Sequence, residues 1–236
     1  MEQLLFILLV FVTNIIQSIT GFAGTLLAMP LGILLIGMDQ ARAVLNVMGL
    51  AASAVIVVSS HRDIDRRELL RISCFMGVGI LLGLGLMQVA QPQALLTVYG
   101  VFLVAFALVR LLSRKSRDIH SRLLLALVLL AAGVVHGLFI SGGSLLVVYA
   151  VNVLPEKRRF RATLSGVWVI LNSVMLVQHI QSGYFTPGLV LLTLVCLVPL
   201  FAAVRLGALL HQRVRQSVFL RLTYLLLLIS GLLILW

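Results

Sequence analysis

Residues 17–30 read QSITGFAGTLLAMP, a glycine-containing interruption between two apolar runs at about 3–20 and 24–37. A similar interruption, HGLFISGGS, occupies residues 136–144 and precedes another short apolar run at 144–154. A helix that crosses a bilayer needs about 20 apolar residues, and the runs 24–37 and 144–154 are shorter than that. We therefore predict a short or broken helix after each glycine break.

The other apolar runs are close to the length of a membrane span. They lie at about 43–60, 72–88, 94–112, 123–140, 162–181, 188–210 and 219–236. Hydrophobic residues make up 61% of the 236 residues and charged residues 11%, and the mean hydropathy is +1.17. A soluble domain is about 45–50% apolar and about 25% charged. This contrast excludes a soluble domain and a disordered chain, and the continuous runs argue against a β-barrel. The sequence predicts an all-α polytopic membrane protein in a lipid bilayer.

Most of the 18 Lys and Arg residues lie in four loops between the apolar runs. These loops cover residues 61–71, 113–122, 155–161 and 211–221. Cytoplasmic loops of membrane proteins carry an excess of Lys and Arg. We therefore expect the four loops in the cytoplasm and both termini on the outer, periplasmic side of a cell inner membrane. The same rule explains the net charge of +11 without a nucleic-acid partner.

The halves 1–118 and 119–236 resemble each other at an offset of 119 residues. The matched positions are Gly24 with Gly143, Thr25 with Ser144, Arg42 with Arg161, Asn46 with Ser165, and Gln17 with His136. Each half contains five apolar segments, and an odd number inverts the second half relative to the first. Inverted repeats around a midplane site are a common plan of secondary transporters. We predict two inverted repeats of about five helical segments each, with chance similarity of leucine-rich segments as the alternative.

The acidic residues indicate the charge of a ligand. All seven lie in predicted loops or at the N-terminus, namely Glu2, Asp39, Asp63, Asp65, Glu68, Asp118 and Glu156. A cation inside the membrane would therefore have no counter-charge, and an anion is favoured. The N-terminal end of a helix also favours anions, and each glycine break supplies such an end. Thr25 and Ser144 can cap these helices or donate a hydroxyl to the anion.

The candidate substrate-binding residues surround the two breaks and the two matched arginines. They are Gln17, Thr20, Gly21, Gly24, Thr25, Arg42, Asn46, His136, Ser141, Gly142, Gly143, Ser144, Arg161 and Ser165. Arg42 is predicted in an outer loop and Arg161 in a basic cytoplasmic loop. For both, two roles remain open: contact with an anion, and stabilisation of the C-terminus of the short helix just before the arginine, 24–37 or 144–154. Gln17 and His136 can bind a substrate or bond a neighbouring helix, and the glycines can serve close helix packing.

The residues 17–30 and 136–144, with an arginine after each, resemble the two signatures of the TauE/SafE family of sulfite-exporter-like permeases. The resemblance covers nearly the whole chain. The first signature is interrupted here as Gly-Phe-Ala-Gly, and the second reads Ser-Gly-Gly-Ser. The resemblance implies an inner-membrane permease for a small anion such as sulfite, a sulfonate, or another organosulfur or carboxylate compound.

We therefore expect a secondary transporter that works by alternating access, with a passive anion channel as the alternative. An intramembrane enzyme would need Ser141 or Ser144 to act with His136, and no carboxylate in a predicted span would orient that histidine. A non-transporting assembly subunit has no sequence feature in its favour. No metal-ligand spacing or nucleotide motif occurs, so we expect no cofactor, no metal and no catalytic residue. A homo-oligomer is compatible with the sequence.

Overall fold

The computed structural model describes residues 2–112 and 121–211, together with 221, 224–225, 228–229, 231–232 and 235. Within these residues the chain is helical and has no strand. The elements are α1 (Glu2–Thr20), α2 (Ala23–Ile36), α3 (Met38–Ser60), η1 (His61–Asp63), α4 (Arg66–Val89), α5 (Pro92–Leu112), α6 (Arg122–Phe139), α7 (Gly143–Val153), α8 (Lys157–Gln181) and α9 (Pro187–His211). The predicted run 219–236 and the basic loops 113–122 and 211–221 lie largely outside the described residues.

Six helices of the described part are long and apolar enough to cross a membrane: α1, α3, α4, α5, α8 and α9. Helix α2 has 14 residues and α7 has 11. These lengths correspond to about 21 and 17 Å, against a hydrocarbon core of about 30 Å. The structure therefore confirms the all-α polytopic class and the two short helices after the glycine breaks.

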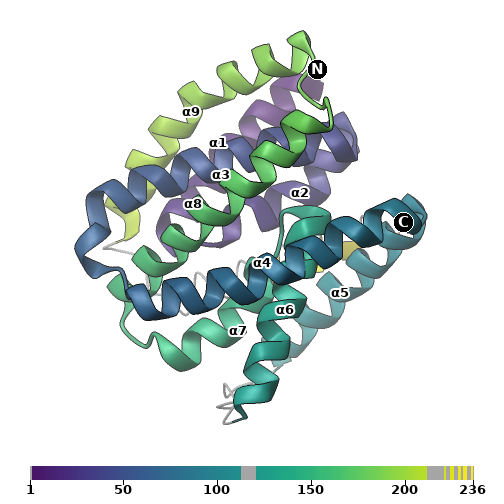
Figure 1. Cartoon of the computed structure of the whole chain (residues 1–236). Coiled ribbons are helices and arrows are strands. Elements are labelled where there is room, and N and C mark those ends of the chain that lie inside the picture. The colour runs from purple at the N-terminus through teal and green to yellow at the C-terminus, as the bar shows by residue number, and fades with distance from the viewer. Residues whose placement is uncertain are drawn as a thin grey trace.

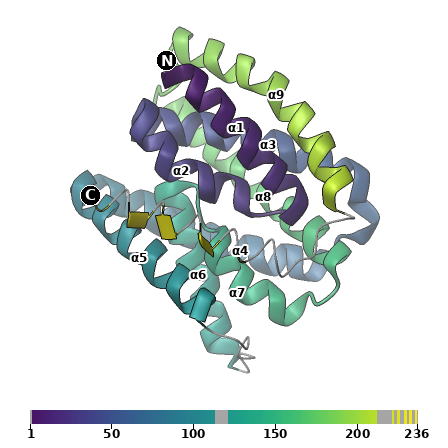
Figure 2. The same cartoon turned by 180° about the vertical axis from the view of Figure 1, so that it is seen from behind.

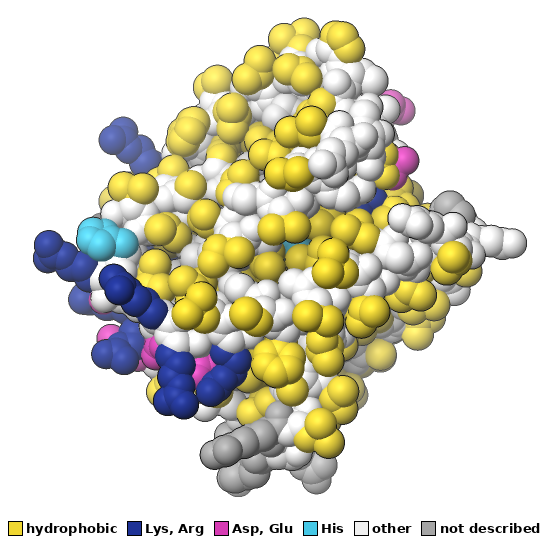
Figure 3. Space-filling model, viewed as in Figure 1, with side chains coloured by type: hydrophobic (Ala, Val, Ile, Leu, Met, Phe, Trp, Pro, Cys, Tyr) yellow, Lys and Arg dark blue, Asp and Glu magenta, His cyan; other side chains and the backbone are white. Residues whose placement is uncertain are grey.

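The surface divides into an apolar body and a basic end. Figure 3 shows hydrophobic side chains over most of the visible face and Lys and Arg gathered at its left edge. In Figure 1 this edge holds the junction of α3 with α4 and the start of α8. The exposed cations there include Arg62, Arg66, Arg67, Arg158 and Arg159. An apolar body with one basic end fits a protein that spans a bilayer. Which end faces the cytoplasm stays a prediction.

The helices form two groups that each draw on both halves of the chain. Figures 1 and 2 show α1, α2, α3, α8 and α9 together on one side, and α4, α5, α6 and α7 on the other. Helix α1 packs on α9, α4 packs on α6, and α3 packs on α8. The predicted halves 1–118 and 119–236 are therefore interleaved rather than side by side. Their relation as inverted repeats stays a prediction.

Close glycine contacts join α4 to α6. A Cβ atom at Gly83 would lie 2.6 Å from the carbonyl oxygen of Val134, and one at Gly137 would lie 2.7 Å from that of Ile80. Gly79 and Gly133 also face each other, with 2.8 Å between either one's Cβ position and the other's Cα. Small residues of this kind let membrane helices approach at backbone distance. The GxxxG spacing of Gly79 and Gly83 therefore serves helix packing.

Several charged residues that the hydropathy pattern assigned to loops lie inside helices, Arg42, Arg161 and Glu68 among them. Arg42 belongs to α3, Arg161 to α8 and Glu68 to α4. Each of these helices begins with a polar turn, which a hydropathy run counts as loop. Asp65 is the N-cap of α4, because its side chain accepts hydrogen bonds from the N–H groups of Arg67 and Glu68. Aspartate is a preferred N-cap residue.

Candidate functional site

The guanidinium of Arg42 lies fully buried where α3 passes α6. Its Nη2 donates a hydrogen bond of 2.7 Å to the carbonyl oxygen of Gly137. Its Nη1 lies 3.9 Å from a carboxylate oxygen of Asp39, whose side chain is 61% exposed. Within the described residues, Nε and Nη1 of Arg42 have no hydrogen-bond partner. A buried charge is costly unless it is paired and hydrogen-bonded, so this cation is under-compensated in the structure.

Two asparagines and a histidine connect α3, α6 and α8 beside Arg42. Nε2 of His136 lies 3.1 Å from Oδ1 of Asn172. Nδ2 of Asn46 donates to the backbone oxygen of Asn172 over 3.0 Å. Nδ1 of His136 and Oδ1 of Asn46 are buried and lack partners within the described residues. The side chains thus leave free polar atoms in the interior, where polar groups are normally satisfied.

His179 and Tyr184 complete this group, and the sequence reasoning missed both. His179 is buried in the last turns of α8, and its two ring nitrogens have no partner within the described residues. Arg42 and His136 lie close enough to His179 to interact with it electrostatically. The ring of Tyr184 lies 5.5 Å from the ring of His179, and its hydroxyl lies close to the Arg42 guanidinium. Tyr184 is half-buried and follows α8.

We name this group the central polar cluster, formed by Arg42, Asn46, His136, Asn172, His179 and Tyr184. The signal that could have found His179 is its spacing along α8. Ser165, Asn172 and His179 follow one another at intervals of seven residues, which places them on one face of a helix. Of these three residues, only Ser165 was among the predicted site residues.

Thr25, Arg42, Asn46 and His136 are the predicted site residues that lie at or beside this cluster. Thr25 and Asn172 lie on either side of Gly49. A Cβ atom at Gly49 would be 3.1 Å from the Thr25 methyl carbon and 3.1 Å from Nδ2 of Asn172, which places Thr25 beside the cluster. Among the other predicted residues, Gly142 packs against His136 of the cluster, with 2.8 Å between its Cβ position and the histidine Cβ. The role of the predicted residues in substrate binding stays a prediction.

The first glycine break satisfies its own helix end. The N–H of Gly24 donates to Oε1 of Gln17 over 2.8 Å. The N–H groups of Phe22 and Ala23 lie 3.4 and 3.3 Å from the hydroxyl of Thr20. These N–H groups at the start of α2 were predicted to bind an anion, but they donate to the side chains of Gln17 and Thr20 instead. Gly21, with φ of +83°, turns the chain between the two helices, a conformation that glycine adopts without strain.

The second break has fewer internal bonds. Helix α6 ends at Ile140, a left-handed residue with φ of +52°. The Ser141 hydroxyl donates to the carbonyl oxygen of Phe139 over 2.9 Å. The hydroxyl of Ser144 is buried and has no partner within the described residues. The second helix end therefore retains an unused polar group.

Thr25 and Ser144 do not cap their helices. Helix α2 starts after Phe22 and α7 starts after Gly142, and neither N-cap residue makes a side-chain capping bond. Both hydroxyl residues lie one to two positions inside the first turn, because each helix starts earlier than its apolar run. The capping role expected from the sequence is therefore wrong.

The glycines of the breaks pack against neighbouring backbone. A Cβ atom at Gly24 would lie 2.5 Å from Cβ of Gln17, and one at Gly142 would lie 2.8 Å from Cβ of His136. One at Gly143 would lie 2.8 Å from the carbonyl oxygen of Phe22, in the other break. The two breaks therefore touch. Gly24 thus packs against Gln17, and Gly142 packs against His136, the residue that the sequence pairs with Gln17.

The two matched arginines each bind the end of a helix from the other half. Arg42 bonds Gly137 in the last turn of α6. Nε of Arg161 donates to the carbonyl oxygen of Ser18, in the last turn of α1, over 2.8 Å. The C-terminal end of a helix carries partial negative charge and free carbonyls. Both arginines therefore bind a helix C-terminus, but that of α6 or α1 and not that of the short helix just before each arginine, which the sequence predicted.

Ser165 is buried in α8, and its hydroxyl lacks a partner within the described residues. Trp168, one turn further, donates from Nε1 to the carbonyl oxygen of Gly21 over 2.8 Å and stacks on His136 with ring centres 5.2 Å apart. Trp168 therefore connects the first break with the cluster. No group of three or more His, Cys, Asp or Glu in the described residues is placed to hold a metal ion.

Comparison with known proteins gives one match. The profile of the family described as sulfite exporter TauE/SafE matches residues 6–234 of the chain. Neither a curated protein nor a solved structure matches it. The matched region spans nearly the whole sequence and all the helices described above, from α1 to α9. The chain therefore belongs to the TauE/SafE family of sulfite exporters, which are membrane permeases.

Proposed function

We propose that this protein is a secondary transporter that carries a small anion through the central polar cluster by alternating access. The observation that supports this proposal is the buried guanidinium of Arg42. Two of its nitrogens have no hydrogen-bond partner within the described residues, and the nearest carboxylate of an ion pair, that of Asp39, is 3.9 Å away and exposed. An anion placed against Nε and Nη1 would supply the missing charge and the missing acceptors. The family supports sulfite, a sulfonate, or another organosulfur or carboxylate anion as the substrate.

The other members of the cluster suit the same ligand. His179 offers two free ring nitrogens and His136 offers one, and a neutral imidazole donates a hydrogen bond from one nitrogen. The Tyr184 hydroxyl, close to Arg42, adds a further donor. The cluster contains no carboxylate, so a cation would find no counter-charge among these six side chains.

The burial of the cluster favours a carrier over a passive channel. Arg42, His136 and His179 are each at most 1% exposed, so an anion reaches them only after helices move. A channel holds a continuous path open, whereas alternating access exposes the site to one side at a time. For an enzyme, the serines would have to engage His136, but His136 is near Asn172 and Ser141 bonds Phe139.

The test is anion flux with purified protein in liposomes. Sulfite, thiosulfate, sulfoacetate, taurine and acetate are offered to the wild type and to Arg42→Gln, with Arg159→Gln as the control. Arg159 is 60% exposed, so its loss removes a positive charge without touching the cluster. We expect saturable uptake of a sulfur anion by the wild type and the control. Arg42→Gln is expected to be at least about tenfold slower, because a bond to a buried charge is lost.

Two readouts separate the candidate functions. Exchange stimulated by anion on the far side of the membrane indicates a carrier, and its absence with rapid flux indicates a channel. Because Arg42 also holds Gly137, a second variant, His179→Ala, tests the cluster without touching that bond. Flux that neither variant changes, in protein that elutes and melts like the wild type, would disprove the cluster as the anion site.

A further inference from the structure

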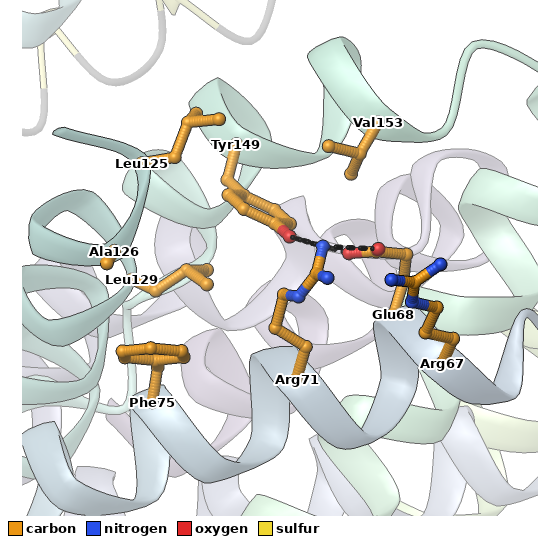
Figure 4. A pocket seen from close by; sticks show the side chains of 9 residues that line it. All are labelled: Arg67, Glu68, Arg71, Phe75, Leu125, Ala126, Leu129, Tyr149 and Val153. Carbon is orange, nitrogen blue, oxygen red and sulfur yellow. Dashed lines mark hydrogen bonds and ion pairs between the residues drawn. The ribbon is translucent and has the colours of Figure 1, made fainter. Parts of the chain in front are cut away.

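A second polar site lies at the basic end of the molecule, between α4, α6 and α7. It is a cavity of about 450 Å³, and it is open to the surface. Figure 4 shows Arg71 and Phe75 rising from α4 toward Leu129 of α6 and Tyr149 of α7. None of its lining residues belongs to the central polar cluster.

The cavity follows from the crossing of α4 with α6. The two helices touch through Gly79 and Gly133, and helices that cross through glycines diverge on either side of the contact. Arg67 lies three turns before Gly79, about 18 Å along α4. At that distance α4 and α6 are apart, and α7 lines the third side with Tyr149.

The polarity of the cavity changes with depth. Arg67, Arg71 and Phe75 succeed one another at intervals of four residues, so they share one face of α4. This face runs from two guanidinium groups at the basic end to an aromatic ring about 12 Å further in. Opposite it, Leu125 and Leu129 of α6 provide an apolar wall.

An ion pair within α4 holds Arg71 in this cavity, and a hydrogen bond from α7 holds its partner Glu68. Nη1 of Arg71 donates to Oε1 of Glu68 over 2.7 Å, and the Tyr149 hydroxyl donates to Oε2 of Glu68 over 2.5 Å. Glu68 is therefore occupied on both oxygens and is only 9% exposed. Within the described residues, Arg67 forms no ion pair. The cavity mouth thus keeps an excess of positive charge.

We propose that this cavity binds an anionic phospholipid, with its phosphate on Arg67 and Arg71 and an acyl chain against Phe75 and Leu129. Basic pockets between helices at the cytoplasmic surface are suited to such headgroups. A route for a free anion would stay polar toward the centre, whereas this cavity becomes apolar. Leu70, next to Arg71 in the chain, is 63% exposed, so apolar surface lies close to the two arginines.

The experiment counts lipids on the purified protein. The wild type, Arg67→Ala and Ala126→Phe are incubated with phosphatidylglycerol or phosphatidylcholine in mild detergent, and bound lipids are counted by native mass spectrometry. Ala126 lines the cavity, so the larger ring obstructs the acyl chain. Arg66→Ala is the matched control, because Arg66 is an exposed neighbour in the same helical turn and does not line the cavity.

We expect the wild type to retain phosphatidylglycerol in preference to phosphatidylcholine. Arg67→Ala should reduce that retention about fivefold, the effect of one interfacial arginine. Ala126→Phe should reduce it as well, and Arg66→Ala should leave it unchanged. Equal retention of the two lipids would overturn the proposal, and so would equal losses in Arg67→Ala and Arg66→Ala. Displacement of the bound lipid by inorganic phosphate alone would show a free-anion site instead.

Discussion

The arginines Arg42 and Arg161 make the same kind of hydrogen bond in this protein. Each donates to a carbonyl at the end of the helix that precedes a break, in the opposite half of the chain. The acceptors, Gly137 and Ser18, are separated by the same offset of 119 as the arginines. The two bonds are thus what inverted repeats would produce. Among the described arginines, only Arg42 is fully buried with two nitrogens that lack a hydrogen-bond partner, and this is why we propose Arg42 rather than Arg161 as the anion ligand.

We predict that Arg161→Gln destabilises the protein without changing anion affinity. The variant removes a charged donor from the carbonyl of Ser18, and such bonds contribute about 1.5–3 kcal/mol. Thermal unfolding in detergent measures the loss, and titration with the transported anion measures affinity. Arg159→Gln, which breaks only an exposed ion pair with Glu156, should shift stability by less than about 1 kcal/mol. A large fall in anion affinity for Arg161→Gln would assign this arginine to the binding site.

The crossing of α4 with α6 depends on glycines that let the two backbones touch. This is expected in a membrane, where lipid competes equally for apolar surface and close backbone approach provides the packing energy. Gly79 meets the backbone of Gly133, whereas Gly77, two residues earlier in α4, has nothing within 4 Å of its Cβ position. Helix α4 thus has two glycines in contact with α6, Gly79 and Gly83, and two without neighbours at their Cβ positions, Gly77 and Gly85.

We predict opposite results for alanine at Gly79 and at Gly77. Gly79→Ala should destabilise the protein by about 1–3 kcal/mol, because the added methyl must push α6 away. Gly77→Ala should leave stability unchanged or raise it by up to about 1 kcal/mol, because alanine is the better helix former. Thermal unfolding of the two variants side by side is the measurement. Equal effects would mean that the α4–α6 crossing is not set by Gly79.

The link between α4 and α7 gives a second prediction for helix pairs. Tyr149→Phe removes the hydroxyl that donates to Glu68. Glu68→Gln removes the negative charge that also forms the ion pair with Arg71. We expect each variant to lower stability, and we expect the double variant to lose less than the sum of both. A double-mutant cycle should give a coupling of at least about 1 kcal/mol. Additive losses would show that the two side chains act independently.

The whole molecule carries its charge asymmetrically, with an apolar body and a basic end (Figure 3). Orientation in the membrane follows from the excess of Lys and Arg in cytoplasmic loops. The start of α3 near Gln40 and the start of α8 near Arg158 belong to opposite ends in this arrangement. Both residues are exposed, and so they report the topology directly.

We predict that a cysteine at Gln40 faces the outside and one at Arg158 the cytoplasm. Gln40→Cys should react with a membrane-impermeant maleimide in intact cells, and Arg158→Cys only after permeabilisation. The parent for both is Cys74→Ser, because Cys74 is exposed while Cys196 is buried. The reverse pattern of labelling would invert the proposed topology and place the lipid site in the outer leaflet.

The sequence by itself determined the class of the protein, the two short helices and the basic end. These are properties of composition and of local runs, and hydrophobic length and loop charge decide them without knowledge of the packing. It placed Arg42, Arg161 and Glu68 in loops, because a polar first turn of a helix reads as loop. The residues around the breaks were singled out as substrate-binding residues, and that role stays a prediction.

Only the tertiary structure decided which polar residues meet. The spacing of Ser165, Asn172 and His179 defines a face of α8, but it does not say that Arg42 of α3 and His136 of α6 lie opposite that face. Those contacts join residues far apart in the chain, such as Arg42 and Gly137, which are separated by 95 positions. They arise because helices of the two halves interleave. The register of that packing depends on where glycines allow backbones to touch, which no local pattern encodes.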